Sequence, residues 1–246
     1  MSDSPSQSGS PGQSETASDP NPTSHLESHR NVILLRSVLI GAATAAPAVG
    51  DFLVPALKRG LMQHVSGLWH LDIDDAAIEA LLAENDKVHR LSMLTMVGGF
   101  LAVLRKTGRL RRLFVGFTIL RGVEETSRAF HLATLLDHYC ARHSVGATIH
   151  EREAKRLREI ADAAVAAAQQ QVAATFVQNA VEQGLRLLQA VPSWALAKVG
   201  RAPMEPPAPI PEVTQSARSL FRDLSARRYF ANVLNSFDKK WREATP

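Results

Sequence analysis

Residues 113–143 read LFVGFTILRGVEETSRAFHLATLLDHYCARH, and this stretch decides the fold class. Its apolar side chains recur every three or four positions, which is the period of an α-helix with one buried face. The candidates for that face are Leu120, Val123, Ala129, Phe130, Ala133, Leu136 and Tyr139. The spacing predicts one long helix or two short ones, and Gly146 closes the region.

The whole chain has the same helical character. Ala and Leu dominate its 246 residues, aromatic residues make up only 6%, and runs of β-branched residues are scarce. This composition favours helices over strands. Apolar residues make up 45% of the chain, which is enough for a real core. We therefore predict an all-α protein, a multi-helix bundle of helical hairpins.

Two segments interrupt the helical pattern. Residues 1–28 are rich in Ser, Pro and Gly with almost no apolar side chains, so we expect a disordered tail. Five prolines within residues 201–212 predict a semi-rigid, extended linker. Between these breaks we predict a helical-hairpin domain (29–146) and a long Ala-rich helical region (147–200). A C-terminal amphipathic helical segment (213–246) follows the linker.

The first hairpin is predicted from a stop signal. Residues 31–46 are apolar on most faces and end at Pro47 and Gly50, after which Asp51 is a candidate N-cap. We expect a second helix from there to about His70. Pro47, Gly50 and Asp51 would then form the turn of a helical hairpin.

Further helices follow from the same rules. Asp74 is placed to cap a short amphipathic helix that carries Ile78, Leu81 and Leu82, and residues 86–104 predict another helix. Residues 149–190 predict one Ala/Gln-rich helix, which starts with the charge pairs Glu151–Lys155 and Glu153–Arg158. Its apolar stripe suits close packing or a coiled coil and consists of Leu157, Ile160, Ala164, Val172, Phe176, Leu185 and Leu188.

Residues 216–241 predict the last amphipathic helix. Its aromatic residues suggest that it docks on the bundle or on a partner, with the Pro-rich segment as tether. The docking candidates are Tyr229, Phe230, Phe237 and Trp241.

Cysteine usage and the N-terminus point to one compartment. The single Cys140 excludes an internal disulfide and a cysteine-based zinc site built from this chain alone. Residues 1–21 lack the basic and apolar regions of a signal peptide. We expect a cytoplasmic protein, with membrane association left open.

The segment nearest to a transmembrane span runs over residues 32–57. It contains Arg36, Pro47, Gly50 and Asp51, and a charge at the centre of a membrane helix costs about 2.5–3.5 kcal/mol. A buried hairpin is therefore the favoured interpretation. An integral or pore-forming protein built from the two apolar hairpins is kept as an alternative.

The most concentrated charge lies between two apolar segments. It comprises five cations within eight residues: Arg105, Lys106, Arg109, Arg111 and Arg112. Each cation near an anionic leaflet contributes about 1 kcal/mol, so this basic cluster is a candidate contact for a membrane surface or an acidic protein. Few aromatic residues flank it, which disfavours nucleic acid. The alternative is a solvated loop between helices.

No sequence motif anchors an enzymatic function. The chain has no phosphate-binding or dinucleotide-binding glycine loop and no nucleophile motif. His131 and His138 share a helix face beside Asp137, but a metal site there would need a further ligand, so interfacial histidines are the favoured interpretation. We predict no catalytic residue, cofactor or metal, and keep an enzyme with a histidine-based metal site as an alternative.

Two adjacent acids lie within the largely apolar stretch. Glu124 and Glu125 would serve proton chemistry if burial raised their pKa. Pairing with Arg121 or Arg128, one turn away, is the more economical interpretation.

Residues 40–51, IGAATAAPAVGD, resemble the small-residue turn of the YcjF-type domain of unknown function. That domain often accompanies bacterial GTPases and membrane-associated proteins. Its turn is followed by a long helix, a short acidic break and a short helix, which is similar to residues 52–70, 72–75 and 76–85 here.

A second part of the resemblance is a small-residue helix pair ending near a tyrosine, similar to residues 116–139. Overall the resemblance covers residues 32–143. The chain has Val115 and Gly116 where the family has a Pro-Gly turn, and it contains no GTPase domain. The resemblance implies that any nucleotide chemistry belongs to a partner.

These observations favour a non-enzymatic helical scaffold or regulatory module, peripheral to a membrane and working with a partner such as a GTPase. We expect a protein partner and keep a membrane surface as a second contact. Homo-oligomerisation through the Ala-rich helix stays open because small residues allow close approach.

Overall fold

A computed structural model describes residues 24–46, 50–83, 113–143, 148–170, 174–192, 195, 210–211, 213–215 and 224–244. Over these residues the fold is all-α, as predicted. The helices are α1 (Ser24–Thr44), α2 (Gly50–Leu68), α3 (Asp75–Leu82), α5 (Leu113–His143), α6 (Glu151–Gln169), α7 (Ala174–Gln189) and α10 (Leu224–Ala244). Between the helices of the described part, an isolated β-bridge joins Ile73 to Ile149.

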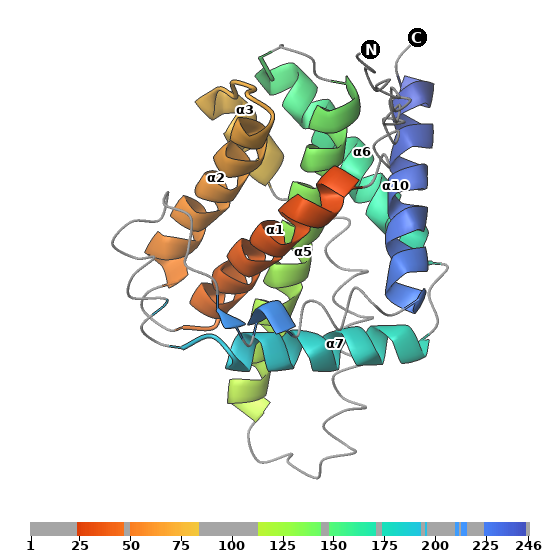
Figure 1. The fold of residues 1–246 in the computed structure, drawn as a ribbon. Coiled ribbons are helices and arrows are strands. Elements are labelled where there is room, and N and C mark those ends of the chain that lie inside the picture. Colours follow the sequence, from red (N-terminus) through yellow and green to blue (C-terminus); the bar gives the residue numbers. More distant parts are fainter. Residues whose placement is uncertain are drawn as a thin grey trace, which may run out of the picture.

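Helix α5 is the centre of the arrangement. Helix α1 runs along it, with α2 and α3 on one side and α6 and α10 on the other, and α7 crosses beneath (Figure 1). The most extensive packing is between α1 and α5, and α10 packs mainly on α6.

The core is shared by side chains from α1, α2, α5, α6 and α10. All seven predicted core residues of α5 are buried, which confirms that stripe, and α5 is one continuous helix of 31 residues. The largest fully buried side chains elsewhere include Ile40 on α1, Met62 on α2 and Phe237 on α10. Helices from both ends of the described chain thus contribute to one hydrophobic core.

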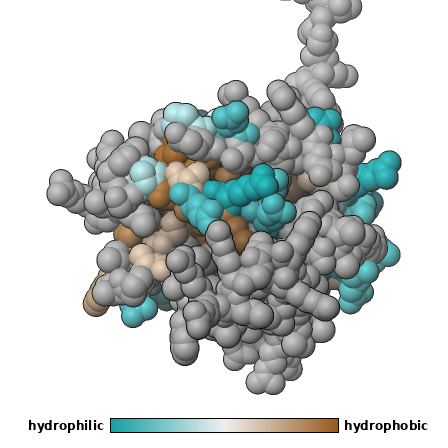
Figure 2. Space-filling view, turned by 90° about the horizontal axis from the view of Figure 1, so that it is seen from below, coloured by the Kyte–Doolittle hydropathy of each residue, from teal (hydrophilic) through white to brown (hydrophobic). Residues whose placement is uncertain are grey.

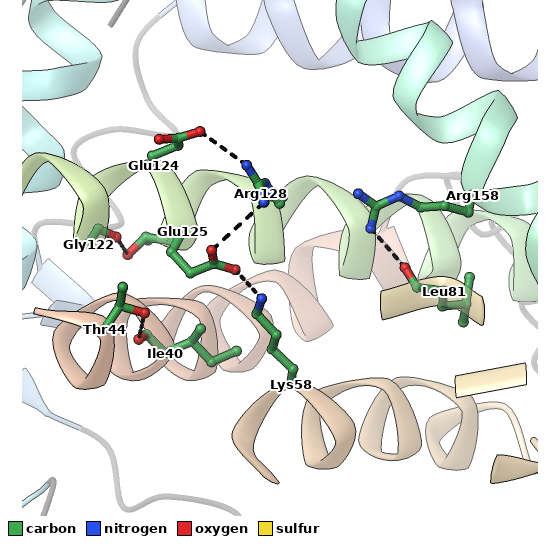
Figure 3. A network of polar contacts seen from close by, with 10 residues as sticks. Ile40, Thr44, Lys58, Leu81, Gly122, Glu124, Glu125, Arg128 and Arg158 are labelled. Atoms are coloured by element: carbon green, nitrogen blue, oxygen red, sulfur yellow. Dashed lines mark hydrogen bonds and ion pairs between the residues drawn. The ribbon is translucent and has the colours of Figure 1, made fainter. Parts of the chain in front are cut away.

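The short helix α3 is fixed at both ends. Asp74 caps it as predicted, because its Oδ1 accepts a hydrogen bond of 2.6 Å from the backbone N–H of Ala77. At the other end, Arg158 of α6 donates from Nη1 to the Leu81 carbonyl oxygen over 2.8 Å (Figure 3). Ile78 and Leu81 are fully buried between these two contacts.

Helix α1 begins earlier than expected. It starts at Ser24, so the last part of the segment predicted as a disordered tail (1–28) is helical. His29, the first residue after that segment, contacts Trp69 and Asp137. These contacts hold the first turns of α1 against the end of α2 and against α5. A composition-based prediction misses such long-range contacts.

The Ala-rich region 149–190 is two helices, and the prediction of one helix was wrong. Helix α6 ends at Gln169 and α7 begins at Ala174. The break turns α7 across the bundle, where a Cβ on Gly184 would lie 2.8 Å from the Val123 side chain of α5. The predicted apolar stripe from Leu157 to Leu188 is therefore shared by two helices that run in different directions.

The two predicted charge pairs of α6 have different outcomes. Glu151 binds Lys155 over 2.5 Å, as predicted. Glu153 and Arg158 do not pair, because a spacing of five residues places them on different faces of a helix. Arg158 binds Asp162 instead, and Glu153 accepts a hydrogen bond from Tyr139.

The end of the Pro-rich segment also differs from an extended linker. Thr214 donates its backbone N–H to the Ile210 carbonyl oxygen, and Ile210 and Val213 are buried in the core. Apolar burial outweighs the extended preference of the prolines at this end. Residues 201–209, residues 216–223 of the predicted last helix and the predicted helix 86–104 lie outside the described residues.

Candidate functional site

The predicted contact residues are only partly within the described chain. The basic cluster of Arg105, Lys106, Arg109, Arg111 and Arg112 lies outside it, as does Pro47 of the hairpin turn. Gly50 and Asp51 form the first turn of α2. A Cβ on Gly50 would lie 2.9 Å from the Ala43 carbonyl oxygen, so the turn brings the two helices into close contact.

The hairpin end carries an exposed aromatic residue that was not among the predicted contact residues. Phe52 is 86% exposed and is the large hydrophobic side chain most accessible among the described residues. The buried stripe of α2 runs through Leu53, Leu57 and Leu61. Phe52 lies off that stripe, and this offset is the sequence signal that could have identified it.

The hairpin end belongs to the side of the bundle formed by α7 (Figure 1). A Cβ on Gly122 of α5 would contact both Ala45, which follows α1, and Leu188 of α7. Seen from that side, apolar side chains lie beside a strip of hydrophilic ones (Figure 2). Over residues 182–189, the part of α7 whose side chains the structure describes, the exposed side chains are polar: Glu182, Arg186 and Gln189.

A buried carboxylate joins three helices at the other end of α1. Asp137 of α5 is 1% exposed, and its Oδ1 accepts over 2.8 Å from Nε1 of Trp69, the residue that follows α2. The same oxygen lies 2.9 Å from His29 Nδ1 of α1. The His29 and Trp69 rings also meet edge to face, with centroids 5.8 Å apart. These contacts fix Asp137 as a structural tie between α1, α2 and α5.

More polar groups continue along the α1–α2 interface. Arg36 is buried in α1 and donates from Nη1 to the Gly60 carbonyl oxygen of α2 over 3.4 Å. One turn beyond Gly60, His64 has its pKa lowered by burial and then by the charges of Arg36 and His29. The neutral form of His64 is therefore favoured in the fold.

The acids of α5 form an ion-pair network with α2 (Figure 3). Arg128 Nη2 binds Glu124 Oε1 over 3.1 Å, and Lys58 Nζ lies 2.6 Å from Glu125 Oε1. Of the two arginines considered in the sequence, Arg128 makes the contact, and Arg121 is exposed. Lys58 was not anticipated because it comes from another helix. Both acids are therefore paired with cations, one from α5 and one from α2.

Helix α10 docks through aromatic side chains. Tyr229, Phe237 and Trp241 are buried, and Phe230 is partly buried. Ring centroids lie 5.5 Å apart for Phe130 and Phe230 of α5 and α10, and 4.8 Å apart for Tyr139 and Trp241. All four predicted docking residues thus lie at the contact with the bundle.

Charged groups add to the docking of α10. Asp238 accepts from His138 Nε2 over 2.8 Å and from Arg142 over 2.7 Å. The Arg156 guanidinium of α6 lies 5.6 Å from the centre of the Trp241 ring, a cation–π distance. The end of α10 is therefore held by both α5 and α6.

The two histidines considered as metal ligands face α10. His138 binds Asp238, and His131 Nε2 lies 2.9 Å from the Tyr229 hydroxyl. Within the described ranges, no group of three His, Cys, Asp or Glu side chains is placed to hold a metal ion.

Two findings concern membrane-spanning helices and similarity to known proteins. Over the part of the chain that the structure describes, no helix combines the length and the apolar character needed to cross a membrane. The chain matches no protein family, no curated protein and no solved structure in the three comparisons.

Proposed function

We propose that this chain is a non-enzymatic helical scaffold or regulatory module that holds a protein partner at the α1–α2 hairpin end. The observation that carries the proposal is the exposure of Phe52 at the start of α2. A large apolar side chain at the tip of a hairpin gains free energy when a partner covers it, by about 1.5–3 kcal/mol for full burial. Phe is among the aromatic residues that are enriched in protein–protein interfaces.

The role of the buried polar groups supports a scaffold. Asp137, Glu125 and Asp238 each bind a His, Lys or Arg side chain from a different helix. In each of these contacts an ionisable side chain binds a neighbouring helix, whereas a catalytic centre needs such groups to face a substrate.

The partner class comes from the resemblance of residues 32–143 to the YcjF-type domain. A bacterial GTPase is accordingly our first candidate partner, and the expected compartment is the cytoplasm. A membrane surface is the second contact that we propose, because the sequence places five cations between residues 105 and 112.

Site-specific photo-crosslinking tests the hairpin contact. A photoreactive amino acid replaces Phe52 in one variant and Glu159, an exposed residue of α6, in a matched control. We expect a discrete protein adduct in cells at position 52 and none at position 159. Absence of an adduct at position 52, or the same adducts at both positions, would contradict the proposal.

Vesicle flotation tests the membrane contact separately. The chain should float with vesicles containing anionic lipid at low salt and remain behind with neutral vesicles. Replacing the five cations by Glu should abolish flotation. Equal flotation of the chain and the charge-reversed variant would remove the membrane part of the proposal and leave the protein contact standing.

A further inference from the structure

His131 of α5 lies among aromatic side chains of α5 and α10. Its ring meets the Tyr229 ring edge to face at 5.6 Å and lies 5.8 Å from the Phe230 ring. Phe130 of α5 packs at 6.2 Å. The imidazole thus lies at the Tyr229 end of the α5–α10 contact.

The hydrogen bonds of this ring define one neutral tautomer. Nδ1 lies 2.6 Å from the Ser127 carbonyl oxygen, which can only accept, so Nδ1 carries the proton. In the neutral ring Nε2 then has a lone pair, and it accepts from the Tyr229 hydroxyl over 2.9 Å. The docked position of α10 uses His131 as a neutral acceptor.

We propose that protonation of His131 releases α10 from the face of α5, so that the C-terminal helix is a pH-sensitive element. A proton on Nε2 removes the acceptor that Tyr229 uses. It also places a positive charge among three aromatic rings, where little water can solvate it.

The direction of the pH effect follows from linkage. Burial lowers the pKa of His131 below its ordinary value in the docked state. When α10 is released, the ring regains its ordinary pKa near 6.5. The released state therefore binds more protons below that pH, and docking weakens as the pH falls through about 6.5.

Among the described residues, no carboxylate is placed against the His131 ring. From α10, Tyr229 faces the ring, while Arg227 and Arg228 are exposed cations. From α6, the Gln169 side chain hydrogen-bonds Tyr229. On α5 itself, Arg128 lies one turn away and is paired with Glu124.

A second histidine on the same helix works in the opposite direction. His138 contacts Asp238 of α10, and a proton on His138 would strengthen that ion pair. Asp238 is already paired with Arg142. The two contacts predict that release starts at the Tyr229 end of α10 and that the Asp238 end follows.

Hydrogen exchange of the full chain tests this inference. Protection factors, corrected for the intrinsic pH dependence of exchange, are compared at pH 7.5 and pH 5.0 for peptides of α10 and of α2. We expect a several-fold loss of protection in α10, greatest around Tyr229, relative to α2. His131→Gln, which keeps an acceptor at both pH values, should remove the loss.

Two further variants, at His138 and His131, separate the effect of His131 protonation from a loss of folding. His138→Gln should leave the loss in place or enlarge it, because it removes only the opposing contact. If His131→Gln does not dock α10 at pH 7.5, His131→Phe keeps a ring in the aromatic cluster without a titrating group. An unchanged α10 in the wild type, or an equal loss in the His131 variant that docks, would overturn the proposal.

Discussion

Gly41 of α1 and Gly122 of α5 are in direct backbone contact, since a Cβ atom on Gly122 would lie only 2.6 Å from the Gly41 carbonyl oxygen. A Cβ on Gly41 would in turn collide with Gly122 and Thr126. The closest packing of the bundle therefore depends on two positions that carry no side chain.

Substituting Gly41 should consequently be costly. Gly41→Val forces α1 and α5 apart, and overpacking of this kind costs about 3 kcal/mol of unfolding free energy. Gly67→Ala is the control, because nothing lies within 4 Å of a Cβ at that helical position. The control should be neutral or stabilise the protein by up to about 1 kcal/mol. Urea unfolding of both variants measures the difference, and equal midpoints would contradict the close crossing.

Arg158 offers a second test, at the junction of α3 and α6. Arg158→Met removes the donor to the Leu81 carbonyl oxygen and should cost about 1.5–3 kcal/mol, the range for hydrogen bonds of charged groups. Lys155→Met on the exposed side of α6 breaks only the pair with Glu151. That control should change stability by no more than about 0.5 kcal/mol. Similar losses in the two variants would show that Arg158 is no more important than a surface charge.

The single cysteine should be chemically silent in the folded protein. Cys140 is 2% exposed, and burial, followed by the charge of Asp137, raises its pKa to about 12. At pH 8 only about one thiol in ten thousand would be a thiolate, the form that reacts. A disulfide reagent should label Cys140 only in denaturant, whereas Glu159→Cys in a Cys140→Ser background should react at once. Rapid labelling of native Cys140 would contradict its placement.

The sequence predicted local features well because their determinants are one turn apart. The Asp74 cap, the Glu151–Lys155 pair and the buried stripe of α5 each depend on spacing within a single helix. Contacts between helices were not predictable in this way. Lys58 meets Glu125 across 67 positions of sequence, and no periodicity of one helix identifies the helix opposite.

At the candidate site, too, the sequence predicted the local signals and not every exposed residue. Stop and cap signals predicted Gly50 as a turn residue and Asp51 as the N-cap, and the structure places both within the first turn of α2. Phe52 was not predicted, although its position off the buried stripe of Leu53, Leu57 and Leu61 distinguishes it from the core residues of α2. The break between α6 and α7 was missed because Ala and Gln continue across it without a Pro or Gly.

The tie at Asp137 provides the last prediction. Asp137→Asn removes the charge that faces His29 and should cost about 1–3 kcal/mol, since a buried group loses its best partner. Double-mutant cycles with His29→Ala and with Trp69→Phe should give coupling energies of about 0.5–3 kcal/mol, because both side chains donate to the same oxygen. The exposed pair Glu182–Arg186 should couple by about 0.5 kcal/mol or less. If all three cycles gave the same small value, Asp137 would not hold α1 and α2 on α5, and the early start of α1 would need another cause.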